Sequence, residues 1–211
     1  MVAARNEEER LGDTLAALRS AFPGARLIVA DDASTDRTPD IAREAGAEVV
    51  RARRNVGKGR ANTPAAELAL EGDPDVVLLC DGDLGASASA LTRLVGHADV
   101  AIAKFARRVG GGFGIALNSS RKTVEKRTGR TLDAPLSGQR ALTAEALRKV
   151  LPFAPGFGME TAMNIDALRA GLNVVEVELE LEHRTTGRTA AGFAHRGKQL
   201  LDIARVYVSR R

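Results

Sequence analysis

Two carboxylates stand directly after an apolar run, in the tripeptide Asp81-Gly82-Asp83 that follows residues 76–80. A buried strand with this ending would bring both carboxylates to the point where the strand meets solvent. Hard cations such as Mg²⁺ and Mn²⁺ take oxygen ligands, and one or two protein carboxylates suffice when phosphates supply the others. A cation held there would neutralise the charge that develops on a departing diphosphate. The same tripeptide is also typical of turns, so the metal-site interpretation depends on the rest of the chain.

The composition is that of a globular protein with a basic surface. The 211 residues are 44% hydrophobic and carry a formal net charge of +4. This length can bury a full core, and no stretch looks like a linker, so we expect one domain over residues 1–211. Positive charge favours anionic partners such as nucleotides, phosphorylated acceptors and anionic lipids. Aromatic residues make up only 3% of the chain, which leaves few stacking platforms and argues against a nucleic-acid partner.

Several common classes of protein lack support in the sequence. Gly57-Lys58-Gly59 has glycine where a P-loop needs Ser or Thr, and the glycines at 110–114 lack the spacing of a dinucleotide-binding motif. The chain has neither a nucleophile elbow nor a zinc-type cluster of Cys and His. The apolar runs are strand-sized and the amino end does not resemble a signal peptide, so we expect a cytoplasmic protein.

Apolar segments alternate with helical patterns through the first hundred residues. We expect strands over residues 1–4, 27–30, 47–51, 76–80 and 99–103. Helices are expected from Asn6, as an N-cap with Glu9 in the capping-box position, and over 38–46 and 62–71. This alternation predicts an α/β fold with a mostly parallel sheet and helices on both faces, whose ligands bind at the carboxyl ends of the strands. Asp32 and Asp81 both stand at such ends.

The second half of the chain begins with a different pattern. Residues 104–136 are rich in glycine and basic residues without clear periodicity, so we expect a flexible loop. Beyond it, helices are expected over 144–151 and 160–170, with a strand over 173–182. An amphipathic, basic helix is expected from Ala191 to the end.

Four motifs in order resemble those of the family 2 glycosyltransferases of the GT-A fold. They lie at residues 4–8, 31–38, 55–59 and 81–83. The resemblance implies a metal-dependent enzyme that transfers a sugar from a nucleotide sugar, with a UDP-sugar as the expected donor and Mg²⁺ or Mn²⁺ as the cofactor. It also implies a nucleotide-sugar-binding half over 1–103 and an acceptor-binding half over 137–211.

The resemblance carries residue roles with it. The implied nucleotide-binding set is Ala4, Glu7, Asp32, Ser34, Lys58, Asp81 and Gly82. Within this set Asp32 reads the nucleobase, Lys58 contacts the nucleotide and Asp81 contacts the ribose. Asp83 is the implied metal ligand, and with Lys58 it forms part of the catalytic set. A lysine offers phosphate a compact positive charge, which agrees with this assignment.

The carboxyl half sharpens the likeness and leaves the acceptor open. Residues 151–160 and 182–184 resemble glucosyl-3-phosphoglycerate synthases, and this likeness implies that His183 completes the metal site. Residues 135–140 also resemble the acceptor segment of polyprenyl-phosphate glycosyltransferases, which makes Ser137, Gly138 and Arg140 candidate anion contacts. Glu160 is a third catalytic candidate, to orient hydroxyls or act as a base. The family's Gln-x-x-Arg-Trp motif is absent, so the stereochemical outcome stays open.

Three functions remain as alternatives. We favour transfer to a polyprenyl phosphate, because the basic final helix and the Gly-rich basic stretch suit an anionic membrane, where we expect peripheral contact at the inner face. The first alternative is transfer to a small phosphorylated acid. The second is a non-enzymatic module that binds nucleotide sugars or a membrane. A second copy of the chain, in a homodimer, is a further candidate partner.

Overall fold

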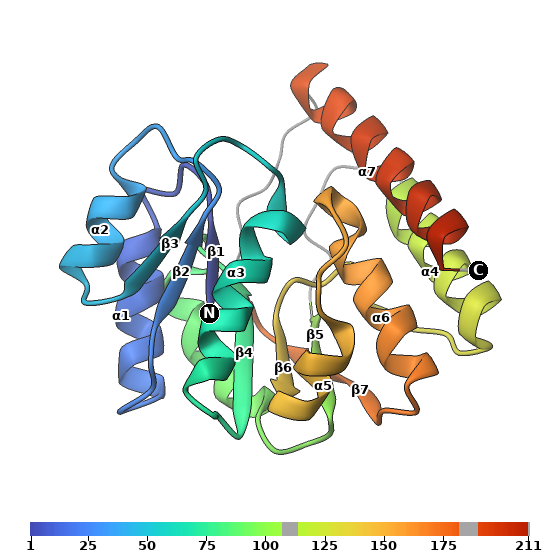
Figure 1. Cartoon of the computed structure of the whole chain (residues 1–211), viewed down its shortest axis with the longest axis horizontal. Helices are drawn as coiled ribbons and strands as arrows, with labels where there is room; N and C mark the ends of the chain where they lie inside the picture. Colours follow the sequence, from blue (N-terminus) through green and yellow to red (C-terminus); the bar gives the residue numbers. More distant parts are fainter. Residues whose placement is uncertain (107–113, 182–189, 211) are drawn as a thin grey trace.

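A computed structural model describes residues 1–106, 114–181 and 190–210, with only the backbone considered for 190–196 and 198. Its strands form one sheet in the order β3-β2-β1-β4-β6-β5-β7 (Figure 1). Their bounds are β1 Val2–Ala4, β2 Ile28–Asp31, β3 Glu48–Arg51, β4 Val76–Asp81, β5 Val100–Phe105, β6 Arg140–Thr143 and β7 Val174–Leu179. Within this sheet β6 runs antiparallel to β4 and β5, and the other pairs are parallel. The expected α/β fold with a mostly parallel sheet is confirmed.

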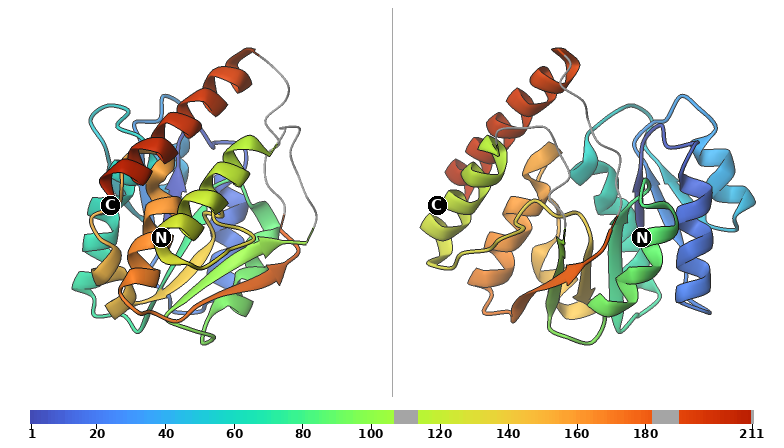
Figure 2. Two further views of the ribbon diagram at one scale, coloured as in Figure 1. Left: turned by 90° about the vertical axis from the view of Figure 1, so that its right-hand side faces the viewer. Right: turned by 180° about the vertical axis from the view of Figure 1, so that it is seen from behind.

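Helices cover both faces of the sheet (Figure 2). The α-helices are α1 Leu11–Ala21, α2 Thr38–Glu44, α3 Lys58–Glu71, α4 Ile115–Thr128, α5 Ala144–Val150, α6 Met159–Arg169 and α7 Ala190–Ser209. Two 3-10 helices, η1 Gly85–Leu94 and η2 Gly156–Gly158, complete the described elements. The core divides accordingly: α3, α5 and α6 pack on one face of the sheet, and α1, α2 and η1 pack on the other.

Strand periodicity explains how β4 joins both layers. Val77 and Leu79 belong to the core under α3, α5 and α6, whereas Cys80 belongs to the core under α1 and η1. Because successive side chains of a strand point to opposite faces, both layers hold the strand. The strand therefore delivers its last residue, Asp81, to a fixed place at the carboxyl edge of the sheet.

Helices α1 and α3 begin at other residues than the sequence indicated. Asn6 was the expected N-cap, but its backbone has φ of 56°, and α1 starts only at Leu11. The Asn6 side chain instead accepts a hydrogen bond from the Thr35 amide, at 2.9 Å. Helix α3 starts at Lys58 rather than Asn62, directly after Gly57, which has φ of 86°. Both differences come from tight turns that carry site residues.

The expected loop over residues 104–136 is a second correction, because it contains the end of β5 and all of α4. Helix α4 lies between Gly114 and Gly129, which are both in the left-handed region. Its buried side chains are Ser120, Thr123 and Val124, so only one large apolar residue faces the core. This narrow face gives too weak a periodicity for the sequence to reveal the helix.

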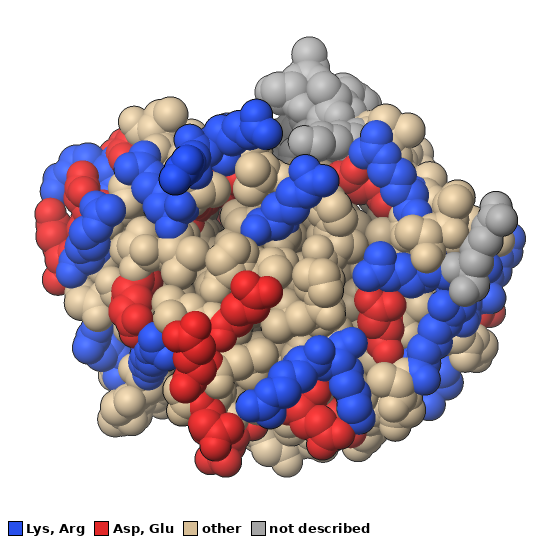
Figure 3. Space-filling model, viewed as in Figure 1, with Lys and Arg blue, Asp and Glu red and all other residues tan. Residues whose placement is uncertain are grey.

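Helix α7 packs beside α4 and over η2 (Figures 1 and 2). Its buried contacts include Asp202, Ile203 and Val206, while Leu201 and Val208 are exposed. Lys and Arg side chains gather along the edge where α4 and α7 lie (Figure 3). No helix in the described parts of the chain is long and apolar enough to cross a lipid bilayer.

Candidate active site

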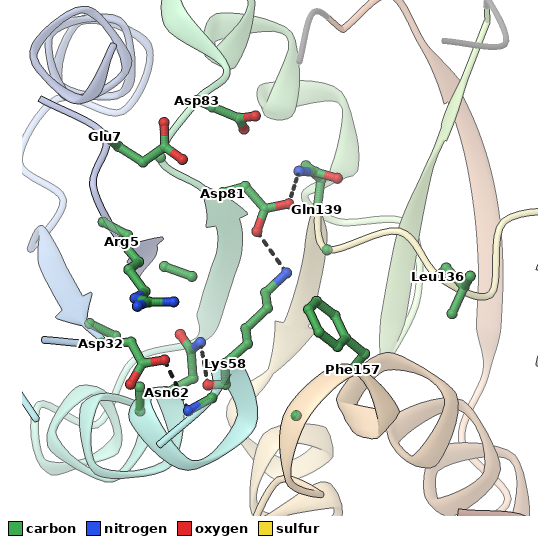
Figure 4. Close-up of a pocket in the computed structure, with 18 of the residues that line it drawn as sticks. Arg5, Glu7, Asp32, Lys58, Asn62, Asp81, Asp83, Leu136, Gln139 and Phe157 are labelled. Carbon is green, nitrogen blue, oxygen red and sulfur yellow. Dashed lines mark hydrogen bonds and ion pairs between the residues drawn. The ribbon is translucent and has the colours of Figure 1, made fainter. Parts of the chain in front are cut away.

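A cleft of about 760 Å³ lies at the carboxyl ends of β1, β2 and β4 (Figure 4). Because β6 is antiparallel to β4, the segment that enters β6 reaches the same edge and closes the cleft from the other side. The lining residues include Ala4, Arg5, Glu7, Asp32, Asn55, Lys58, Asn62, Asp81, Gly82, Asp83, Leu136, Ser137, Gly138, Gln139, Phe157 and Gln199. This size falls in the range of small-molecule and cofactor pockets, about 300–1,000 Å³.

Lys58 lies at the centre of the cleft between two carboxylates. Its Nζ is 2.7 Å from Asp81 Oδ1 and 2.8 Å from Glu160 Oε1. Burial by itself would lower the pKa of Lys58, but the charges of Asp81 and Glu160 outweigh it and raise the pKa above its ordinary value. The lysine is therefore a permanent cation in the middle of the site, able to bind an anionic group.

The loop before Lys58 is held by Asp32. Both oxygens of this carboxylate accept backbone hydrogen bonds, Oδ1 from the Val56 amide at 2.7 Å and Oδ2 from the Gly57 amide at 2.9 Å. Asp32 lines the cleft as the sequence predicted, although it is only 7% exposed. It thus faces the cleft and also fixes the turn from which α3 and Lys58 start.

Residues 31–38 anchor the loop between β1 and α1. The Ser34 hydroxyl donates to Asp31 and accepts a hydrogen bond from the Asn6 amide, at 3.0 Å for the latter. The Thr38 hydroxyl accepts a hydrogen bond from the Glu7 amide at 2.8 Å. Ser34 is buried and is not among the residues that line the cleft, whereas Ala4 and Glu7 line it. The structure therefore places Ser34 behind the wall that Ala4 and Glu7 form.

The turn of Asp81-Gly82-Asp83 is clamped by α1. Thr14 is buried, and its hydroxyl donates to the Gly82 carbonyl at 2.9 Å. Arg10 Nη1 donates to the Asp83 carbonyl at 3.1 Å. Gly82 has little room for a side chain, since a Cβ there would lie 3.3 Å from the Ala3 carbonyl oxygen. These contacts fix the backbone that directs Asp81 and Asp83 into the cleft.

The segment before β6 approaches Asp81 and Lys58 closely. Gln139 Nε2 donates to Asp81 Oδ2 at 2.8 Å. A Cβ on Gly138 would lie 2.6 Å from Lys58 Nζ and 2.7 Å from Asp81 Oδ2, so only glycine fits there without displacing the ion pair. Ser137 lines the cleft, and its hydroxyl donates to Gln139 Oε1 at 3.2 Å. The structure thus brings Ser137 and Gly138 together with Lys58 and Asp81, which the sequence predicted to bind the nucleotide sugar.

Arg140, the remaining predicted acceptor contact, does not line the cleft. Its side chain is fully buried, with Nε donating to the Ser137 carbonyl at 2.8 Å and Nη1 donating to Asn164 Oδ1 at 2.5 Å. Nη2 donates to the Pro135 carbonyl at 3.3 Å. Burial lowers the pKa of Arg140 to about 10, against the opposing charges of Glu160 and Glu176. Arg140 supports the segment 135–137 from within.

The donor set for a divalent cation consists of oxygens. Asp81 and Asp83 both line the cleft at the end of β4, and Figure 4 shows their carboxylates on the same side of it. One carboxylate can suffice for a hard cation that takes its other ligands from phosphate and water, and Asp81 already binds Lys58 and Gln139. The described residues hold no group of three or more His, Cys, Asp and Glu side chains suited to a metal. His183, the second predicted ligand, lies outside the described residues.

A smaller cavity of about 170 Å³ adjoins the cleft. It is lined by Lys58, Leu136, Phe157, Glu160 and Gln199, and all of these except Glu160 also line the cleft. Glu160, the third catalytic candidate, is 6% exposed in the first turn of α6. The carboxylate therefore faces this cavity while it binds Lys58.

Several lining residues escaped the sequence interpretation. Asn55 and Arg5 lie inside recognised motifs without an expected role. Their polar side chains within these motifs were a signal from which a place in the cleft could have been predicted. Gln139 and Phe157 lie in the same way inside the recognised segments 135–140 and 151–160. Gln199 carries no such signal, because only the packing of α7 brings it to the cleft.

Comparisons with known proteins agree with this geometry. The family model for Glycosyl transferase family 2 matches residues 1–147. The undecaprenyl-phosphate mannosyltransferase of Micrococcus luteus is 31% identical over 219 residues, which cover 95% of this chain and 89% of that protein. Glycosyltransferase AglJ of Haloferax volcanii is 30% identical over 193 residues, which cover 86% of this chain and 62% of that protein.

Solved structures share the whole fold. A crystal structure of glucosyl-3-phosphoglycerate synthase from Mycobacterium tuberculosis in complex with Mn²⁺, UDP-glucose and glycerol 3-phosphate superposes with a TM-score of 0.78 at 25% identity. The superposition covers 99% of this chain and 78% of that one. Another crystal structure of this synthase has 28% identity and the same TM-score. The expected GT-A fold is thereby confirmed. With its motifs gathered in one cleft and the family model matched over most of its length, the chain belongs to glycosyl transferase family 2 and is a glycosyltransferase.

Proposed function

We propose that this protein transfers a sugar from a UDP-sugar to a lipid phosphate, with a divalent cation. The observation that carries the proposal is the cleft in which a permanent cation, Lys58, lies beside Asp81 and near Asp83. A nucleotide diphosphate needs both positive charge for its phosphates and carboxylates for its metal. Family membership favours this enzymatic role over a non-enzymatic binding module.

The donor would lie along the cleft. Ala4, Glu7 and Asp32 wall the end proposed for the nucleobase, and Asp81 stands where the ribose would be held. Asp83 and His183, which lies outside the described residues, are the proposed metal ligands. Uridine is the proposed base because the solved relative of similar fold was crystallised with UDP-glucose and Mn²⁺. The cation, when bound, would supply Lewis-acid stabilisation of the diphosphate.

The residues of the chain would act mainly through charge and position. As the bond between the sugar's anomeric carbon and the diphosphate oxygen breaks, negative charge grows on the leaving group, and Lys58 is placed to stabilise it. The Asp32 contacts to the Val56 and Gly57 amides keep Lys58 in place without reorganisation during the reaction. Glu160 would orient hydroxyl groups of the sugar or the acceptor.

A lipid phosphate agrees with the sequence relationship. The curated relative with the broader coverage is an undecaprenyl-phosphate mannosyltransferase. A phosphate monoester is largely ionised near pH 7, so its oxygen can attack the anomeric carbon without a base. Such an acceptor would bring the protein to a membrane surface, where the basic edge formed by α4 and α7 would favour anionic lipids.

A small phosphorylated acid is the second candidate. It is favoured by the likeness to the synthase crystallised with phosphoglyceric acid. If the attacking group is a hydroxyl of such an acid, it must lose a proton, and Glu160 is the carboxylate that lines the cavity next to Lys58. A hydroxyl acceptor therefore requires Glu160 to act as a base, whereas a phosphate acceptor does not.

Calorimetric titration with UDP, with GDP as the control nucleotide, tests the donor half of the proposal. We expect UDP to bind more tightly than GDP in Mn²⁺ and to lose affinity in excess chelator. Equal or absent binding of both nucleotides would contradict the assignment. Turnover of UDP-sugars is then compared with detergent-dispersed polyprenyl phosphate and with 3-phosphoglycerate in plain buffer. Turnover of only the small acid would overturn the lipid acceptor.

A further inference from the structure

The C-terminal helix contributes to the wall of the smaller cavity. Gln199 of α7 lines this cavity together with Phe157 of η2, Lys58 and Glu160. An aromatic ring, an amide, a carboxylate and an ammonium suit a hydroxylated ring, which has apolar C–H faces and several hydrogen-bonding groups. On the function proposed above, this cavity is where the transferred sugar would be recognised.

One buried carboxylate of α7 fixes this wall. Asp202 is 6% exposed, and its Oδ2 accepts a hydrogen bond from the backbone amide of Phe157 at 3.1 Å. Its Oδ1 accepts a hydrogen bond from Arg205 Nη1 at 2.8 Å, and the Arg205 side chain is 76% exposed. A buried carboxylate is costly unless it is bound. The contact with Phe157 therefore gives Asp202 a specific orientation toward η2.

The glycines of η2 show how closely the carboxylate approaches. A Cβ on Gly156, which has φ of +64°, would collide with Asp202 Oδ2. A Cβ on Gly158 would lie 2.6 Å from Val206 Cγ2 and 3.1 Å from the Asp202 carbonyl oxygen. Backbone thus packs directly on α7 at both ends of η2. Small shifts of Asp202 must be transmitted to Phe157, since no flexible side chain lies between them.

The contact continues to the start of α3. A Cβ on Gly57 would lie 3.3 Å from the Gly156 Cα, and a Cβ on Gly59 would collide with the Ala154 carbonyl oxygen. The backbone beside Lys58 therefore rests on the segment 154–156, which rests in turn on Asp202. Helix α7, η2 and the start of α3 form one packed unit around the smaller cavity.

We propose that Asp202 is a positioning residue that sets the sugar-recognising wall of the site through the Phe157 amide. The carboxylate itself touches neither donor nor acceptor. It holds η2 so that Phe157 and Gln199 line the same cavity of about 170 Å³ as Lys58 and Glu160. This role rests on the proposed function, and it concerns the sugar part of the donor rather than the nucleotide part.

The test compares the affinities of two probes, UDP and UDP-glucose, both in Mn²⁺. The ratio of their dissociation constants reports the sugar-side wall, because the nucleotide part is common to both. In Asp202→Ala we expect the UDP dissociation constant to stay within about twofold of the wild type and the ratio to shift by about threefold or more. Asp202→Asn should restore the wild-type ratio, since its amide oxygen still accepts the Phe157 hydrogen bond.

A matched control separates positioning from simple docking of the helix. Asp166 binds Arg210 near the end of α7, at 2.8 Å, and it lines neither the cleft nor the smaller cavity. Asp166→Ala should lower the melting temperature without shifting the ratio. The proposal is overturned if Asp202→Ala leaves the ratio unchanged, or if Asp166→Ala shifts it equally. If the wild type binds neither probe, the proposed function itself fails, and the positioning role fails with it.

Discussion

The ammonium of Lys58 lies 2.8 Å from the carboxylate of Glu160, although the two residues belong to the first turns of different helices. A cation at the start of α3 opposes the helix dipole, whereas a carboxylate at the start of α6 is favoured by it. The ion pair with Glu160, and the second one with Asp81, offset the unfavourable position of Lys58. Lys58 thus contributes both to the stability of the fold and to the positive charge of the site.

Removal of Lys58 should therefore reduce stability as well as function. In Lys58→Met, Asp81 and Glu160 lose their common cation, and we expect unfolding free energy to fall by about 2 kcal/mol, since the group is partly open to solvent. The double variant Lys58→Met/Glu160→Gln should recover about 1 kcal/mol, because it removes one of the stranded charges. Urea denaturation measures both. A double variant that is no more stable than Lys58→Met would contradict the pairing of Lys58 with Glu160.

Gly138→Ala should weaken UDP binding by about tenfold or more, because the added Cβ must displace the Lys58–Asp81 pair. Gly197→Ala is the matched control: a Cβ on Gly197 of α7 meets nothing within 4 Å. Calorimetry with UDP should find the control unchanged, and helix propensity should stabilise it by about 0.5–1 kcal/mol. Wild-type affinity in Gly138→Ala would show that this close approach does not matter for the nucleotide.

Loss of the Asp83 carboxylate should remove the metal-dependent part of UDP binding. In Asp83→Asn we expect the affinity in Mn²⁺ to fall by about tenfold or more, to the value that wild-type protein has in chelator. Asp40→Asn removes a carboxylate from the exposed ion pair with Arg43 on α2 and serves as the control. Metal dependence that persists in Asp83→Asn would transfer the ligand role to other residues.

Arg140→Lys should destabilise the protein by about 3 kcal/mol, because a lysine cannot supply the planar fork that reaches Ser137, Asn164 and Pro135. Arg148→Lys, at an arginine that pairs with the exposed Asp73, should change the unfolding free energy by less than about 0.5 kcal/mol. Urea denaturation of both variants checks the comparison. Equal stabilities would argue that the buried fork is dispensable.

The single thiol predicts an alkaline loss of stability. Burial raises the pKa of Cys80 to about 12, from an ordinary 9.0. Above pH 9 the unfolded chain gives up this proton while the folded chain keeps it, so stability falls as pH rises, by up to about 1.4 kcal/mol per pH unit from this group. The loss between pH 9 and 10.5 should be smaller in Cys80→Ala. Parallel losses in both proteins would exclude the thiol as the cause.

Several residues at the ends of β1, β2 and β4 line the cleft where the sequence placed them, because this side of the cleft is built from local signals. Asp32 directly follows β2 and Asp81 ends β4, as the apolar runs indicate, whereas α3 starts at Lys58 and not at the expected Asn62. The positions of Asp32 and Asp81 depend on buried strands and on the common direction of β1, β2 and β4. Such features are visible in periodicity and turn residues.

The side of the cleft next to β6 could not be predicted in the same way. Arg140 has the residue type of an anion contact, but the β6 register turns its side chain into the core, where it supports the backbone. Gln139 reaches Asp81 only because β6 lies beside β4. Helix α4 has a single large apolar residue in its buried face, Val124, so its periodicity was too weak to detect. These outcomes depend on contacts between distant segments.

The reversed direction of β6 has a consequence for how this protein could diversify. Residues 137–139 reach the cleft before a strand, whereas Asp32 and Asp83 reach it at or after the ends of strands. Insertions between α4 and β6 would therefore change only one wall of the cleft and would leave the pairing of β1, β2 and β4 intact. Evolution could thus vary this wall without altering the wall that the ends of β1, β2 and β4 form.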